Sequence, residues 1–219
     1  LDPNTTLSVD NPEILANLAN AEWALQVTRR NLGGFDASLS YFRGREDLPT
    51  VTLVGLPPSS ARAEYPWVSR VGLDVVGALN DVGLWLEGAV STPEGGRQYH
   101  EVVAGGDYTL DNGLYLMGQF YQMGADHPAV VLSSTGSARE AQDYLVAVGR
   151  KTAGDSLTLQ LSGVYALKSR GYALLPEVTF NLADATDLVL GYAQVVGGEG
   201  DPLLGWFPAQ AYAKVRMSF

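Results

Sequence analysis

The sequence predicts an all-β protein, in which antiparallel strands run up and down to form a β-barrel that crosses a membrane. Three observations support this fold class. Apolar and polar residues alternate with a period of two in about eleven segments of roughly ten residues. No helix is expected between these segments, and short and long connections follow one another along the chain. A strand needs only ~9–11 residues to cross a bilayer, so each segment is long enough.

Composition argues against several other classes. No run of about 18 apolar residues is present, which excludes a membrane-spanning helix. The formal net charge is -10 and Lys and Arg form no cluster, so a nucleic-acid surface is not expected. The chain has no cysteine, which removes disulfides, thiolate metal sites and thiol catalysis. No cofactor is expected.

Residues 1–21 differ from the rest of the chain. Asn11-Pro12-Glu13 is a plausible helix start, with Asn as the cap, Pro in the first turn and an acid near the positive helix end. Ile14, Leu15 and Leu18 add a short apolar face. This region is predicted to be an external loop with a short helix.

Residues 22–219 are predicted to be transmembrane strands joined by short periplasmic turns and longer extracellular loops. The expected strands are 23–28, 35–41, 67–75, 84–90, 101–108, 114–121, 144–148, 157–165, 172–181, 188–192 and 211–219. Short turns begin at Asn31, Asn80, Asp111, Thr152 and Leu182, and longer loops begin at Gly44, Thr92, Gly124 and Val196. Asn112-Gly113 is a strong hairpin signal, because it tolerates positive φ angles. The short connection at Lys168 departs from the rule, and the island 51–54 could extend a neighbouring strand.

The two faces of the expected strands differ in charge. Charges inside the strands keep to one parity, at Asp36, Arg70, Asp74, Glu87, Glu101, Asp107, Glu177, Lys214 and Arg216. The uncharged parity carries aromatic residues near strand ends: Trp23, Tyr41, Trp67, Phe120, Tyr144, Tyr165 and Tyr172 on the long-loop side, and Phe35, Tyr108, Phe180 and Phe219 on the short-turn side. Two aromatic belts around an aliphatic middle favour a membrane over a soluble β-sandwich or lipocalin-like barrel, which also alternates.

The last strand ends on Phe219, with Met217 and Val215 on the same parity. This ending is similar to the assembly signal of Gram-negative outer-membrane porin-type β-barrels, and most of residues 22–219 resembles the C-terminal part of such a barrel. The family usually has a small residue five places before the end, where this chain has Lys214. The resemblance implies an outer-membrane location in a Gram-negative-type bacterium, contact with outer-membrane lipid and insertion by the barrel-assembly machinery.

Strand parity leads to an expectation about the whole barrel. Bacterial single-chain barrels have even strand numbers and periplasmic termini, so the strand at Trp23 would run downward from the outside. The chain is therefore expected to be the C-terminal part of a barrel of about 14 or 16 strands, with an odd number of N-terminal strands missing. The alternative is a complete twelve-stranded barrel in which Thr5 to Val9 supplies a short first strand.

The charged parity would then face a water-filled interior. The predicted pore-lining residues are Asp36, Arg70, Asp74, Trp85, Glu87, Glu101, Asp107, Tyr115, Gln119, Tyr121, Glu177, Lys214 and Arg216. Lys151 is also expected to face inward, and the acids still outnumber the bases. A channel for passive diffusion of ions or small hydrophilic solutes follows, with a mild cation preference. The alternative is that these charges merely pair across strands. Trp85, Tyr115 and Tyr121 could stack on sugars or pack against an inward-folded loop.

A structural sleeve and an outer-membrane hydrolase are the two other function classes. A structural barrel that sleeves or anchors a partner protein in its lumen has the same sequence pattern as a channel. A hydrolase needs a His beside a nucleophile or an acid, and neither His100 nor His127 has such a partner at motif spacing, so no enzyme is expected. A metal site is not expected either, because two separated histidines and loop acids such as Glu199 and Asp201 form no ligand set.

Overall fold

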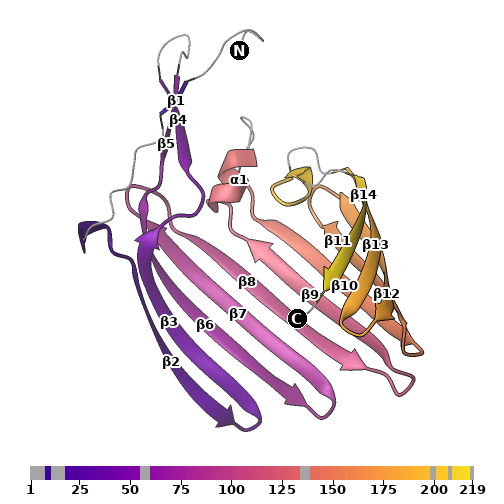
Figure 1. Ribbon diagram of the computed structural model, residues 1–219. Helices are drawn as coiled ribbons and strands as arrows, with labels where there is room; N and C mark the ends of the chain where they lie inside the picture. The colour runs from indigo at the N-terminus through magenta and orange to yellow at the C-terminus, as the bar shows by residue number, and fades with distance from the viewer. Residues whose placement is uncertain are drawn as a thin grey trace.

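The computed structural model describes residues 8–10, 18–54, 60–133, 139–197, 201–206 and 209–217. Its main element is one eleven-stranded antiparallel sheet in which neighbouring strands follow one another along the chain (Figure 1). The strands are β2 (Trp23–Leu32), β3 (Phe35–Arg45), β6 (Trp67–Leu79), β7 (Val82–Pro93), β8 (Tyr99–Thr109), β9 (Leu114–Met123), β10 (Gln142–Ala153), β11 (Leu157–Ala166), β12 (Tyr172–Ala183), β13 (Thr186–Val196) and β14 (Gln210–Met217). The prediction of an all-β meander of about eleven strands is confirmed.

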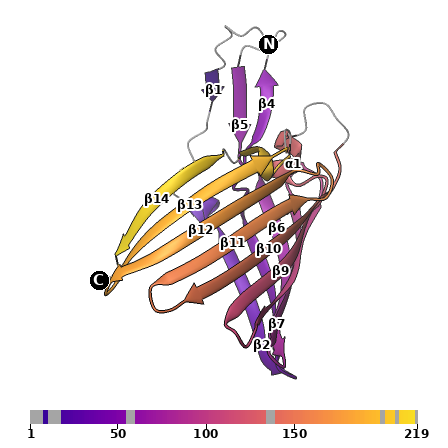
Figure 2. The same ribbon diagram turned by 90° about the vertical axis from the view of Figure 1, so that its right-hand side faces the viewer.

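A second, three-stranded sheet stands beyond one end of the large one (Figures 1 and 2). It consists of β1 (Ser8–Asp10), β5 (Ser60–Glu64) and β4 (Thr50–Val54), and β1 pairs with β5 in parallel. The island at 51–54 therefore forms its own hairpin and does not extend a strand of the large sheet. Ser8 and Val9 belong to the small sheet, whereas residues 5–7 and the expected helix start at Asn11 lie outside the described residues.

The connections separate by length, as predicted. At one end of the large sheet the strands are joined by turns of a few residues, and positive φ angles occur there at Asn31, Asn80, Gly113, Gly154 and Ala185. At the other end the connections include the small sheet, the helix α1 (Pro128–Ser133) and the 3-10 helix η2 (Leu204–Trp206). Another 3-10 turn, η1 (Leu18–Asn20), precedes β2. The link between β11 and β12 remains short.

Cross-strand register shows which residues share a face, because directly paired residues project to the same side. Asp74 pairs with Glu87, and this row continues through Val103 and Tyr121 to Tyr144. Helix α1 and η2 cover this side, since Val130 and Leu204 pack with Tyr144 and Met123 in one buried cluster. Figures 1 and 2 show that the sheet curls around this side, which is called the concave face below.

The opposite, convex face is apolar and exposed. Its exposed leucines come from most strands: Leu25, Leu39, Leu73, Leu86, Leu116, Leu145, Leu161, Leu174 and Leu190. Charged residues on this face lie toward strand ends, at Arg29, Arg43, Arg45, Asp143 and Lys151. In the part of the chain that the structure describes, the strand middles of this face carry no charge.

The large sheet is open. Its end strands are β14 and β2, which do not pair with each other in the described residues. Eleven strands in antiparallel order give β2 and β14 the same direction, so a direct join would be parallel. None of the described helices is long and apolar enough to span a membrane.

Candidate pore-lining face

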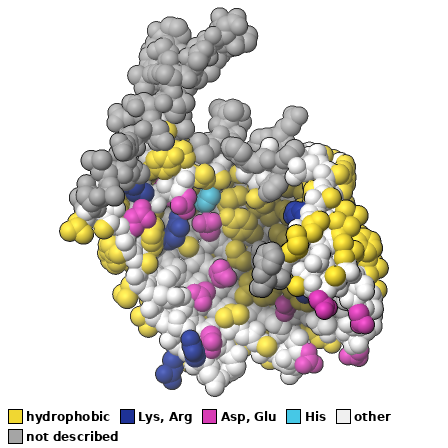
Figure 3. Space-filling view, in the orientation of Figure 1, with side chains coloured by type: hydrophobic (Ala, Val, Ile, Leu, Met, Phe, Trp, Pro, Cys, Tyr) yellow, Lys and Arg dark blue, Asp and Glu magenta, His cyan; other side chains and the backbone are white. Residues whose placement is uncertain are grey.

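All of the predicted pore-lining residues lie on the concave face. Asp36, Val76, Trp85, Gly105 and Gln119 are successive cross-strand partners and form one row across five strands. The other predicted pore-lining residues of these strands lie in parallel rows on the same side. At the far edge, Glu177 aligns with Gly191 and then with Tyr212, which places Lys214 and Arg216 on the same side. Figure 3 looks into the hollow, across which Asp and Glu side chains are distributed. Their role in lining a pore remains a prediction.

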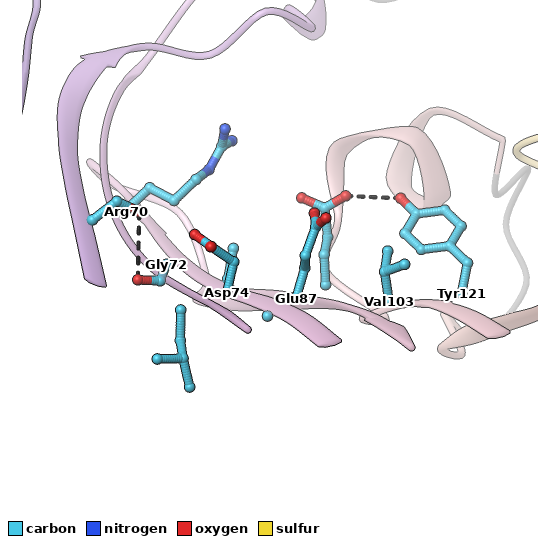
Figure 4. Close-up of a pocket in the computed structure, with 11 residues that line it drawn as sticks. Arg70, Gly72, Asp74, Glu87, Val103 and Tyr121 are labelled. Carbon is cyan, nitrogen blue, oxygen red and sulfur yellow. Dashed lines mark hydrogen bonds between the residues drawn. The ribbon is translucent and has the colours of Figure 1, made fainter. Parts of the chain in front are cut away.

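Two carboxylates lie side by side on neighbouring strands of the concave face. Asp74 on β6 pairs directly with Glu87 on β7. Both line a cavity of about 280 Å³ whose wall also includes Arg70, Glu101 and Tyr121 (Figure 4). The hydroxyl of Ser38 donates a hydrogen bond to Asp74. Glu87, in contrast, has no hydrogen bond or ion pair with any residue that the structure describes.

A buried polar cluster lies nearer the long-loop end. Glu46, which follows β3, is almost fully buried, and its Oε1 accepts a hydrogen bond of 2.6 Å from the Tyr99 hydroxyl. Arg70 donates to Ser91 at 2.8 Å and to the Tyr99 oxygen at 3.2 Å, and its Nη2 lies 3.6 Å from the other Glu46 oxygen. Arg70 is therefore largely neutralised by Glu46.

Beside this cluster a loop histidine meets the wall. His127 precedes α1, and its Nε2 lies 3.5 Å from Oε1 of Glu101 on β8. The Tyr121 hydroxyl donates to the same carboxylate oxygen at 2.7 Å. The Tyr99 ring meets the imidazole edge-on, with 5.1 Å between ring centroids. Glu101, which is predicted to line the pore together with Tyr121, is therefore in contact with a residue of the loop between β9 and β10.

The aromatic residues of the concave face are bonded to the wall. The Trp85 indole donates to Gln119 at 3.1 Å, and the Tyr115 hydroxyl donates to Asp107 at 3.0 Å. The Arg150 guanidinium lies 4.8 Å from the centre of the Tyr115 ring. At the other edge Tyr212 donates to Glu177 at 2.9 Å, with the Lys214 ammonium 4.5 Å from the ring centre. These contacts pair many concave-face charges and leave Glu87 as an exception.

The loop that contains η2 is anchored by one acid. Asp201 is 3% exposed and accepts hydrogen bonds from the Tyr144 hydroxyl at 3.0 Å and the Ser169 hydroxyl at 2.8 Å. The backbone N–H groups of Leu203 and Leu204 donate to it as well. The loops carrying α1 and η2 therefore both fold onto the concave face.

Two placements from the sequence are wrong. The sequence predicts Tyr144 in the convex aromatic belt, but the side chain is 0% exposed on the concave face, where its hydroxyl donates to Asp201. The sequence predicts that Lys151 faces the interior, but the register places Arg150 on the concave face and Lys151 on the convex face. Both errors have one cause. Apolar residues occupy both faces of β10 in its middle, and its charged residues stand only near its ends, so alternation does not show which face is which. The sequence gives no sign of the roles of Glu46, Tyr99 and Arg150, and it indicates Asp201 only as a loop acid.

The remaining predicted sites lie elsewhere. Val215 and Met217 are exposed on the convex face of β14, and Phe219 lies outside the described residues. His100 is on the convex side at the long-loop end, 3.3 Å from the Gln122 amide oxygen, and is separate from His127. Among the described residues no group of three or more Asp, Glu or His side chains is arranged to hold a metal ion.

Comparison of the chain with protein-family models, with curated proteins and with solved structures finds no match.

Proposed function

We propose that the protein is a porin-like outer-membrane channel of a Gram-negative-type bacterium, through which ions or small hydrophilic solutes diffuse passively with a mild preference for cations. The observation that carries the proposal is the contrast between the two faces of the sheet. The convex face exposes leucines on most strands. On the concave face Glu87 is the register partner of Asp74 and forms no ion pair with a base among the residues that the structure describes.

Lipid is the environment that suits the convex face. Moving a Leu side chain from water into hydrocarbon gains roughly 1.5–3 kcal/mol, so a face with leucines on most strands is far more stable against lipid than against water. Aromatic contacts also gather at one end of it. The rings of Trp23 and Tyr41 are 5.0 Å apart, and Arg43 and Arg45 lie over the Trp67 ring. Such groups suit a membrane–water interface.

A channel requires a closed wall. Strand β2 is an end strand of the sheet, and all ten of its residues are exposed. Apolar and polar residues alternate along it as they do along the inner strands. Because β2 and β14 run in the same direction, an antiparallel wall is completed by an odd number of further strands. Closure would then give an even total, and about 14 or 16 strands lies in the range of bacterial outer-membrane barrels. These strands, outer-membrane lipid and the barrel-assembly machinery are the proposed partners.

The charge balance of the concave face supports cation preference. The acids on this face include Asp36, Asp74, Glu87, Glu101, Asp107 and Glu177. The bases on the same face include Arg70, Arg150, Lys214 and Arg216. Arg70 is held beside the buried Glu46, so its field is largely cancelled. A lumen with excess negative charge concentrates cations.

Recording from the purified protein in planar bilayers tests the proposal. Stable ohmic current steps are expected, with a reversal potential of the cation-selective sign in a KCl gradient. A silent bilayer together with a stoichiometric partner held by the protein would favour the structural sleeve instead. A monodisperse preparation in buffer without detergent would contradict both membrane functions.

A further inference from the structure

The segment that follows β9 is held on the concave face by apolar and polar contacts. The Gly124 N–H donates to the His100 carbonyl at 2.8 Å, and Val130 of α1 is 2% exposed in the cluster that contains Tyr144. Between these two anchors, the His127 side chain is 13% exposed and its Nε2 lies 3.5 Å from Glu101. The imidazole therefore lies between the segment and the wall.

The backbone defines which imidazole nitrogen carries the proton. The Ala129 N–H donates a hydrogen bond of 3.2 Å to Nδ1 of His127, so in the neutral ring Nδ1 is the acceptor. The proton of the neutral ring is then on Nε2, which faces the Glu101 carboxylate. His127 is poised to form an ion pair with Glu101 when it takes up a second proton.

The surroundings of His127 contain few competing charges. Glu101 and Tyr99 face it from β8, and Tyr121 on β9 donates to Glu101. Arg70 on β6 lines the same cavity as Glu101 and acts on its carboxylate, but its direct contacts are with Tyr99, Ser91 and Glu46, and Glu46 offsets much of its charge. On its own segment, the Asp126 carboxylate lies 3.7 Å from Arg139.

We propose that protonation of His127 tightens the hold of residues 124–133 on the concave wall, so that the docking of this inward-folded segment depends on pH. The second proton turns the contact with Glu101 into a charge-assisted pair, roughly twice as strong as a neutral hydrogen bond. The bond from Ala129 is lost, but it joins neutral groups and is the weaker one. The effect on docking is independent of the proposed function, whereas a resulting fall in conductance in mild acid rests on it.

Hydrogen exchange of the full chain, refolded in detergent or vesicles, tests the docking directly. Exchange of the His127 and Val131 amides, which donate to the Gly124 and His127 carbonyls, is expected to slow by about fivefold from pH 7.5 to pH 5.5 after correction for the intrinsic pH dependence. His127→Gln removes this change. His100→Gln is the matched control, because the chain has only two histidines and the His100 ring contacts Gln122 at the convex rim. It is expected to behave like the wild type.

The proposal is overturned if wild-type protection does not depend on pH, or if His100→Gln abolishes the dependence. Glu101→Gln provides a second variant on the wall should His127→Gln fail to fold, and it is also expected to remove the dependence. Conductance is recorded in parallel. If the exchange result is as expected but no current flows at any pH, the channel proposal fails and the docking proposal stands.

Discussion

The indole N–H of Trp85 on β7 donates a hydrogen bond of 3.1 Å to the side-chain oxygen of Gln119 on β9, although strand β8 runs between them. The contact is possible because Gly105 of β8 has no side chain: an added Cβ there would lie 2.5 Å from the indole ring and 2.8 Å from the Gly118 carbonyl oxygen. Trp85 therefore lies flat against the wall and ties three strands together.

Gly105→Ala is expected to destabilise the sheet by about 1–3 kcal/mol, because the new methyl group forces the indole and a backbone oxygen to move. Gly118→Ala is the control, since a Cβ at that position meets no atom within 4 Å. Denaturant unfolding of the refolded protein, followed by tryptophan fluorescence, measures both. Equal stability of the two variants would show that the Trp85 contact is not tightly packed.

Glu87→Gln is expected to reduce the cation preference of the channel. The substitution removes the carboxylate that lacks a partner in the described structure and leaves Asp74, which is bonded to Ser38, in place. The ratio of cation to anion permeability, obtained from the reversal potential in a KCl gradient, should fall by about twofold. Asp155→Asn removes the same charge from an exposed turn and should have a smaller effect. An equal fall in both variants would implicate net charge, not Glu87.

Tyr144→Phe tests the anchor of the η2 loop. Loss of the hydroxyl breaks the 3.0 Å bond to Asp201, which keeps its bonds from Ser169 and two backbone N–H groups, so a loss of about 1 kcal/mol is expected. Faster amide exchange at Leu204 is expected to accompany it. Tyr165→Phe on the convex face is the matched control and should change neither quantity. Unchanged exchange at Leu204 in Tyr144→Phe would contradict the anchoring role.

The strands and most of the charged face could be predicted because their signal is local. Where one parity carries the charges, as with Asp74 or Glu101, alternation alone assigns the face correctly. In β10 that signal fails, since Tyr144 and Leu145 are both large and apolar and Arg150 directly precedes Lys151. Only pairing with Tyr121 on β9 settles the face of Tyr144.

The loop contacts could not be predicted from the sequence for another physical reason. Glu46 and Tyr99 are 53 residues apart, and Tyr144 and Asp201 are 57 apart, so no periodicity connects them. The parallel pairing of β1 with β5 is non-local in the same way. Such contacts depend on where the long connections fold, and composition alone indicates only that these connections exist.

Leu161→Lys distinguishes a lipid-facing convex surface from a water-facing one. Leu161 is 53% exposed at the middle of β11, where a lysine facing the bilayer midplane is expected to cost about 2–4 kcal/mol. Gln160→Lys is the matched variant: it places the same charge on the concave face, between its register partners Glu177 and Arg150, and should be tolerated there. Unfolding and insertion into vesicles measure both variants. A harmless Leu161→Lys, or one that makes the protein soluble without detergent, would mean that water and not lipid covers this face.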